Sequence, residues 1–124
     1  MEENIVIIEE EWGASLKIKD GTKLQDQSVL AKVTKMISDL REKNKRKIMI
    51  LGMENMKDKA TVNVYQEIEM FQKLGGNGFK VAFLAPHRVN DENAKFAELV
   101  GLNRGVFIQY FAQKEEALAW LLKF

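Results

Sequence analysis

The chain has 124 residues, 46% hydrophobic and 30% charged, a composition that is ordinary for a globular domain and favours neither a disordered nor a fibrous class. Its 19 Lys and Arg residues nearly balance its 18 Asp and Glu residues, so the formal net charge is +1 and we expect no nucleic-acid partner. The absence of Cys excludes disulfides, thiolate metal ligands and a Cys nucleophile.

The amino-terminal residues do not have the pattern of a secretion signal. They are acidic where a signal peptide is basic, and the apolar run that follows them is too short. No stretch approaches the roughly 20 apolar residues that a membrane-spanning helix needs. We therefore expect one domain over residues 1–124, located in the cytoplasm and without a membrane span.

Two strands are predicted at the start of the chain. The continuous apolar run in residues 4–8 is typical of a strand that is buried on both faces. Apolar and polar residues alternate over residues 14–19 with the period of a half-buried strand, so the two strands are expected to form a hairpin. Asp20 and Gly21 then form a turn pair at which the chain leaves the sheet.

The first predicted helix follows, and either Asp26 or Ser28 can cap its first turn. A cationic tract at residues 41–47 comes after it and is either a solvated helix exit, which is the favoured interpretation, or an anion-binding patch. The apolar residues of the helix recur at helical spacing and are Val29, Val33, Met36, Ile37 and Leu40.

Strands and helices alternate through the rest of the chain. The predicted strands are the apolar runs at residues 48–51, 79–84 and 106–111. The predicted helices cover residues 60–74, residues 91–100 and a closing segment with the stripe Ala117, Trp120, Leu121 and Phe124. Helices of this length between strands favour a mixed or mostly parallel sheet covered by helices, with the strand at 48–51 in its centre.

The helix predicted over residues 91–100 has recognisable ends. Pro86 stops the preceding strand, Asn90 can cap the helix, and Gly101 is expected just after its last residue. The residues expected to anchor this helix in the core are Phe96, Leu99 and Val100.

Candidate binding residues lie after the two central strands. Pro86, His87 and Arg88 directly follow one of these strands, at the end where open α/β sheets bind ligands, although an ordinary exposed loop is the favoured alternative. Met53 and Met56 follow the other, and they either fill the core, which is favoured, or line an adaptable apolar pocket.

Catalytic motifs are not found in the sequence. His87 is the only His, which excludes a His-pair metal site, and no Gly-x-Ser-x-Gly elbow supplies a nucleophile for it. The Gly-rich segment 75–78 follows a helix and precedes a strand, the reverse of the order in a phosphate loop. We expect no cofactor, no metal and no enzyme, and proton transfer by His87 with Glu54 or Asp58 is the least favoured hypothesis.

Three segments carry a family resemblance. The sequence Glu-Glu-Ala-Leu-Ala-Trp-Leu at 115–121, Phe-Ala-Glu-Leu-Val at 96–100 and Asn-Arg-Gly-Val at 103–106 resemble the STAS domain, the fold of bacterial anti-sigma-factor antagonists, and in particular its sporulation-antagonist-like branch of small bacterial proteins. The similarity of element order covers nearly the whole chain. It implies an α/β, STAS-like mixed sheet of about five strands in the order ββαβαβαβα.

The resemblance also bears on function. Antagonists of this family carry a phosphorylatable Ser between the third strand and the second helix, where this chain reads Lys-Asp-Lys-Ala-Thr at 57–61. Thr61 can take a phosphate near a helix N-terminus, although a capping or exposed Thr is favoured. The resemblance implies a non-enzymatic regulatory module that binds a protein partner, or itself, through the third strand to second helix region.

The alternative is a domain that binds a small apolar ligand or lipid in a pocket at the carboxyl ends of the central strands. An exposed edge at the first strand would also suit a homodimer. The residues expected to bind the partner or the ligand are Met53, Asn55, Met56, Asp58, Thr61, Pro86, His87 and Arg88.

Overall fold

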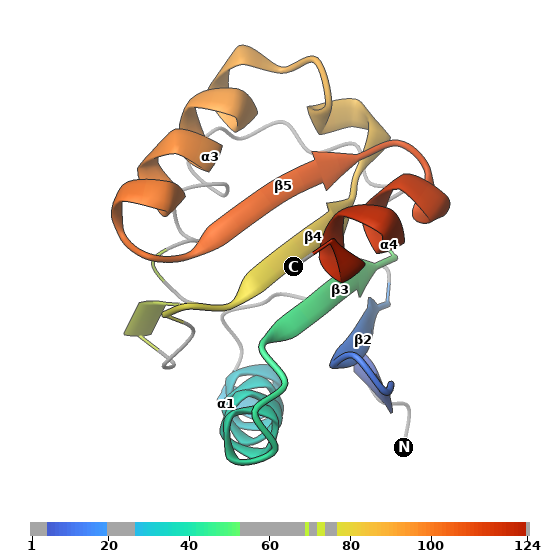
Figure 1. Ribbon diagram of the computed structural model, residues 1–124, viewed down its shortest axis with the longest axis vertical. Helices are drawn as coiled ribbons and strands as arrows, with labels where there is room; N and C mark the ends of the chain where they lie inside the picture. The colour runs from blue at the N-terminus through green and yellow to red at the C-terminus, as the bar shows by residue number, and fades with distance from the viewer. Residues whose placement is uncertain (1–4, 20–26, 53–68, 70–71, 74–76, 124) are drawn as a thin grey trace.

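The computed structural model describes residues 5–19, 27–52, 69, 72–73 and 77–123. Its α/β fold is a five-stranded sheet with helices on both faces (Figure 1). The elements in chain order are β1 (Ile5–Glu9), β2 (Ala14–Ile18), α1 (Gln27–Glu42), β3 (Lys47–Leu51), β4 (Lys80–Leu84), the 3-10 helix η1 (Pro86–Arg88), α3 (Glu92–Asn103), β5 (Phe107–Phe111) and α4 (Lys114–Leu122).

The sheet is mixed, as the sequence predicts. Its strand order is β1-β2-β3-β4-β5; β1 runs antiparallel to β2, and the other neighbouring strands are parallel. The predicted hairpin is confirmed, and β3 occupies the centre. Most of the helix predicted over residues 60–74 lies outside the described residues, as do Asp20, Gly21 and Asp26.

One face of the sheet is packed against α1. The five residues predicted to form the apolar face of this helix are all buried, and they join a core cluster with alternate residues of the strands, such as Leu16, Ile48 and Ile50. The helical spacing of large aliphatic side chains was therefore sufficient to identify the buried face. Ser28 lies inside α1, so the prediction that it caps the helix was wrong.

The opposite face is covered by α4, which contacts β3, β4 and β5 (Figure 1). Its residues Ala117 and Leu121 are buried with Met49 and Ala82, as the predicted stripe requires. Trp120 is half-buried, and its ring centroid lies 5.6 Å from that of Phe111. This second, smaller cluster makes the sheet a buried middle layer between helices.

Lys80 connects the sheet to the end of α4. Its ammonium donates a hydrogen bond to the Trp120 carbonyl oxygen and lies 4.4 Å from the centroid of the Trp120 ring. Burial lowers the pKa of Lys80, and the charges of Lys47 and Lys123 lower it further. This cation is therefore engaged in packing α4 on the sheet.

The orientation of α3 differs from the prediction. Phe96 and Leu99, expected in the core, are 57% and 59% exposed. The side of α3 that packs against the sheet instead presents small residues, namely Ala94, Ala97 and Gly101. Gly101 lies within the helix rather than after it, and a Cβ there would come within 2.7 Å of the Val106 carbonyl oxygen. Close backbone approach selects the small face, because large side chains would hold the helix away from the strand.

The burial predicted for the first strand was also wrong. β1 is an edge strand, and Val6, Ile7 and Ile8 are 45%, 38% and 50% exposed. Ile5 alone within this strand is buried, beneath the α1 side of the sheet. The position of β1 contributes to this exposure, since β2 is its one neighbour among the described strands and α4 contacts β3, β4 and β5.

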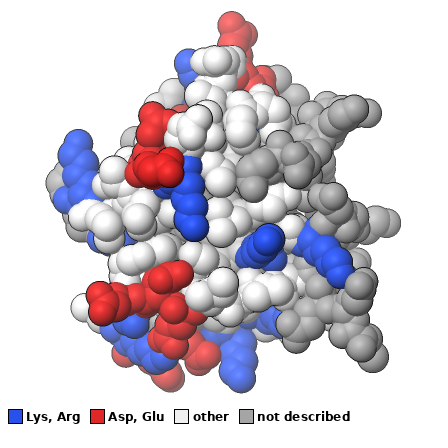
Figure 2. Space-filling model, turned by 90° about the vertical axis from the view of Figure 1, so that its right-hand side faces the viewer, with Lys and Arg blue, Asp and Glu red and all other residues white. Residues whose placement is uncertain are grey.

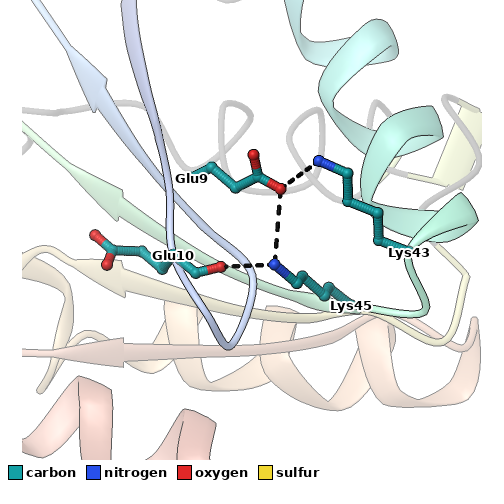
Figure 3. Close-up of polar contacts among 4 residues, drawn as sticks. All are labelled: Glu9, Glu10, Lys43 and Lys45. Carbon is teal, nitrogen blue, oxygen red and sulfur yellow. Dashed lines mark hydrogen bonds and ion pairs between the residues drawn. The ribbon is translucent and has the colours of Figure 1, made fainter.

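The cationic tract after α1 holds the β1–β2 hairpin (Figure 3). Lys43 forms an ion pair with the Glu9 carboxylate, and Lys45 lies 3.6 Å from the same carboxylate oxygen while donating a 3.1 Å bond to the Glu10 carbonyl oxygen. The hydrogen bond from Lys43 lowers the pKa of Glu9, and the same bond raises the pKa of Lys43. These lysines thus act within the fold, which favours the helix-exit interpretation over an anion-binding patch.

The close packing of α3 can be tested at Gly101. Gly101→Ala adds a methyl group against the Val106 carbonyl, so we expect the free energy of unfolding to fall by about 1–3 kcal/mol. Helix propensity alone would raise it by about 1 kcal/mol, so the two effects have opposite signs. Urea unfolding measures the change. Asn103→Ala, at an exposed position of α3, is the control, and a Gly101→Ala protein of unchanged or greater stability would contradict the packing argument.

Candidate functional site

The chain turns away from the sheet directly after β4. Ala85 has an extended backbone, with φ −141°, and its N–H donates a 2.9 Å bond to the Phe111 carbonyl oxygen. Pro86 then begins η1, and the Arg88 N–H closes its turn with a 2.9 Å bond to the Ala85 carbonyl oxygen. Pro suits this position because its fixed φ is helical and the first turn needs no N–H there.

The three residues of η1 have different environments. Pro86 and His87 are exposed, whereas Arg88 is only 3% exposed. The Arg88 guanidinium carbon lies 5.4 Å from the Tyr110 ring centroid, and that ring lies 5.2 Å from the Phe83 ring. Arg88 thus anchors η1 on the aromatic side chains of β4 and β5, and this anchor holds His87 at the surface.

Glu98 connects α3 to the outer edge of β5. Its Oε2 atom accepts a 3.1 Å hydrogen bond from the Tyr110 backbone N–H. The half-buried position of this carboxyl raises its pKa, and the weaker effects of the Tyr110 N–H bond and of Lys95 lower it. A side chain therefore takes the place that a further strand would occupy beside Tyr110.

The outer face of α3 carries a row of large apolar side chains. Phe96, Leu99 and Leu102 are 57%, 59% and 54% exposed, and their spacing of three residues aligns them along one side of the helix. We call these three residues the α3 row. Neighbouring exposed large apolar residues are a characteristic of binding surfaces, whereas single ones are common on any protein surface.

The predicted binding residues divide into two groups. Pro86, His87 and Arg88 lie at the carboxyl end of β4, and the structure exposes the first two and buries the third. The others lie outside the described residues and are Met53, Asn55, Met56, Asp58 and Thr61. The last described residue before them is Gly52, where φ is +96° and a Cβ would come within 2.0 Å of the Ile18 carbonyl oxygen.

The sequence interpretation missed the α3 row and the Glu98 contact. It assigned Phe96 and Leu99 to the core because large apolar residues usually define the buried face of a helix. The signal for the opposite orientation was present in Ala94, Ala97 and Gly101, which repeat at three and four residues and form a small face. Nothing local in the sequence indicates that Glu98 reaches the backbone of a later strand.

The described part of the chain has neither a cluster of metal ligands nor a membrane-spanning helix. No three side chains among its His, Asp and Glu residues lie close enough together to hold a metal ion. No helix there is both long and apolar enough to cross a membrane.

No protein-family model, curated protein or solved structure matches this chain.

The raised pKa of Glu98 predicts a pH dependence of stability. The folded protein binds this proton more tightly than the unfolded chain, so ionisation of Glu98 lowers the free energy of unfolding. This stability is lost as the pH rises through 4.5, the ordinary pKa of a Glu carboxyl, and on through the raised pKa of Glu98. In Glu98→Gln an amide oxygen can still accept the Tyr110 bond, and no ionisation occurs.

We therefore expect the stability of Glu98→Gln, relative to the unmodified protein, to increase as the pH rises from below 4.5 to neutral. Urea unfolding at a series of pH values measures the difference. Glu92→Gln makes the same chemical change at an exposed position of α3 and controls for the loss of one charge. A difference for Glu98→Gln that does not vary with pH would show the prediction to be wrong.

Proposed function

We propose that this protein is a STAS-like, non-enzymatic binding module that engages a protein partner through the α3 row. The single observation that supports this proposal is the exposure of Phe96, Leu99 and Leu102 along one side of α3. The sequence resemblance to regulatory STAS domains and the α/β fold with a mixed sheet are consistent with it. Fold alone does not imply a function, so the surface carries the argument.

The α3 row has the chemistry of a protein-binding surface. Burial of apolar area contributes about 25 cal/mol per Å², and three half-exposed large side chains on one helix offer a continuous area to bury. Polar residues that are themselves exposed, such as Glu92, Lys95 and Asn103, occupy the same helix and can form the rim of an interface. The partner that fits is a protein with an apolar groove or helix face that receives anchors at this helical spacing.

The packing of α3 explains why these side chains stay outside. Gly101 and the neighbouring Ala residues occupy the side that meets the sheet, and the approach is too close for larger groups. Rotating the helix to bury Leu99 would move Glu98 away from the Tyr110 N–H and lose that hydrogen bond. The α3 row is thus held outward by the fold itself, which preorganises it for a partner.

The residues after β3 remain part of the proposal through the STAS-like resemblance. Met53, Asn55, Met56, Asp58 and Thr61 are expected partner contacts on that basis, and Pro86 and His87 are exposed residues that follow β4. A small apolar ligand bound near Met53, Met56, Pro86 and His87 is the alternative. Native mass spectrometry of the purified protein distinguishes the two, because a tightly bound ligand adds its own mass.

The proposal predicts a selective loss of partner binding. Leu99→Glu places a charge in the middle of the α3 row, and we expect about one tenth or less of the normal partner recovery to remain after affinity capture from the native cell. Leu122→Glu is the matched control, because Leu122 on α4 is similarly exposed, at 52%, and receives the same substitution. Quantitative mass spectrometry compares the captured proteins.

The outcome that supports the proposal is a protein captured by the unmodified chain and by Leu122→Glu but lost with Leu99→Glu. Equal capture by all three proteins would show that the α3 row is not the binding surface. We expect both variants to be folded, because the substitutions are at exposed positions, and circular dichroism checks this.

A further inference from the structure

The outer side of β1 presents a row of backbone hydrogen-bonding groups. Glu10 and Gly13 exchange two backbone bonds, of 2.8 Å and 3.3 Å, at the turn of the β1–β2 hairpin. Along an antiparallel ladder, residue pairs that exchange two backbone hydrogen bonds alternate with pairs that exchange none. Counting from Glu10 and Gly13, the next pairs that exchange hydrogen bonds are Ile8 with Ser15 and Val6 with Lys17.

It follows that Ile5, Ile7 and Glu9 direct their N–H and C=O groups away from β2. Within the described residues, β2 is the only strand that pairs with β1. The ion pair of Glu9 with Lys43 uses its side chain and leaves these backbone groups in place. The β1 edge is therefore a template for another strand.

The other edge of the sheet is covered. The Tyr110 N–H, which points away from β4, donates to Glu98, and α3 packs along β5 (Figure 1). The amide of Val106, just before β5, donates a 2.9 Å bond to the Gly101 carbonyl oxygen. A strand from a second molecule would have to displace α3 to pair with β5, so among the described strands β1 is the edge available for pairing.

The side chains of β1 do not oppose strand pairing. Its sequence is Ile-Val-Ile-Ile-Glu, without the Lys or Pro that proteins use to protect an edge strand. Val6 and Ile8 are exposed on one face of the sheet, and Ile7 is exposed on the other. Figure 2 shows the right-hand side of the view in Figure 1, where the described surface carries uncharged areas together with separate groups of charged side chains.

We infer that two copies of this chain pair through β1, antiparallel and about a two-fold axis at Ile7. In this register Ile7 exchanges two backbone bonds with Ile7 of the second copy, and Ile5 of each copy exchanges two with Glu9 of the other. All backbone groups that β1 directs outward are then satisfied. The two five-stranded sheets become one continuous sheet across the axis.

The same register pairs apolar side chains on both faces. Val6 of each copy lies opposite Ile8 of the other in a non-exchanging pair, where side chains approach most closely. The two Ile7 side chains meet on the opposite face. Glu9, the one charged residue of β1, brings its own counter-ion in Lys43. A two-fold pairing of identical edges is closed, so it yields a dimer rather than a filament.

Hydrogen exchange and sedimentation test this pairing together. Sedimentation equilibrium from low micromolar to near-millimolar concentration is expected to show a monomer–dimer equilibrium. Over the same range the amides of Ile5, Ile7 and Glu9 should become protected from exchange, whereas those of Val6 and Ile8 are bonded to β2 at every concentration. A protein that is monomeric throughout, or whose Ile5, Ile7 and Glu9 amides exchange independently of concentration, would overturn the inference.

Proline substitutions provide a matched pair of variants. Ile7→Pro removes an N–H that points outward, which an edge strand tolerates, so we expect a folded protein whose dimer dissociation constant rises about tenfold or more. Val6→Pro removes an N–H bonded to β2, so it should reduce the stability of the monomer. The reverse result, with folding lost in Ile7→Pro and kept in Val6→Pro, would show that the assigned edge is wrong.

Ile8→Lys is a second variant that tests the β1 dimer, and it is needed if Ile7→Pro does not fold. The Ile8 side chain is 50% exposed in the monomer, and Lys there would place a charge against Val6 of the second copy. We expect a folded protein with a dissociation constant raised about tenfold or more. Leu99→Glu distinguishes this dimer from partner binding by α3, because it should leave the dimer unchanged. A dimer lost with Leu99→Glu and kept with Ile8→Lys would overturn the inference.

Discussion

Backbone hydrogen bonding at the two edges of the sheet is the constraint on which the arrangement of the surfaces depends. An open sheet leaves a row of donors and acceptors on each outer strand. At the β5 edge, α3 supplies hydrogen-bond acceptors: Glu98 accepts a bond from the Tyr110 N–H, and the Gly101 carbonyl accepts one from the Val106 N–H just before β5. At β1 the outward groups of Ile5, Ile7 and Glu9 face away from the sheet, and two very different edges result.

Covering the β5 edge has a consequence for α3. The helix must approach the strand closely enough for Glu98 to reach a backbone amide, and Gly101 lies where a single methyl group would meet the Val106 carbonyl oxygen. Small residues therefore occupy the inner side. The larger residues of α3 are turned outward, so the same contact that closes the edge also creates the exposed α3 row.

The two proposed interactions use opposite ends of the sheet. Pairing through β1 would leave β5 and α3 at the two far ends of the joined sheet, because the strand order runs from β1 at one edge to β5 at the other. A dimer would then present two copies of the α3 row, and a partner with two sites could bind with avidity. The lysines after α1 contribute by fixing the β1–β2 hairpin through Glu9 and the Glu10 carbonyl (Figure 3).

The sequence by itself determined the α/β class, the hairpin, the central place of β3 and the buried face of α1, because local hydrophobic periodicity carries this information. It also located the turn at Pro86. The tertiary structure alone decided that α3 packs on Ala94, Ala97 and Gly101, that Arg88 is buried while His87 is exposed, and that β1 forms an exposed edge. These features depend on which elements become neighbours and how closely their backbones approach, and neither quantity is expressed in the apolar pattern of any one segment.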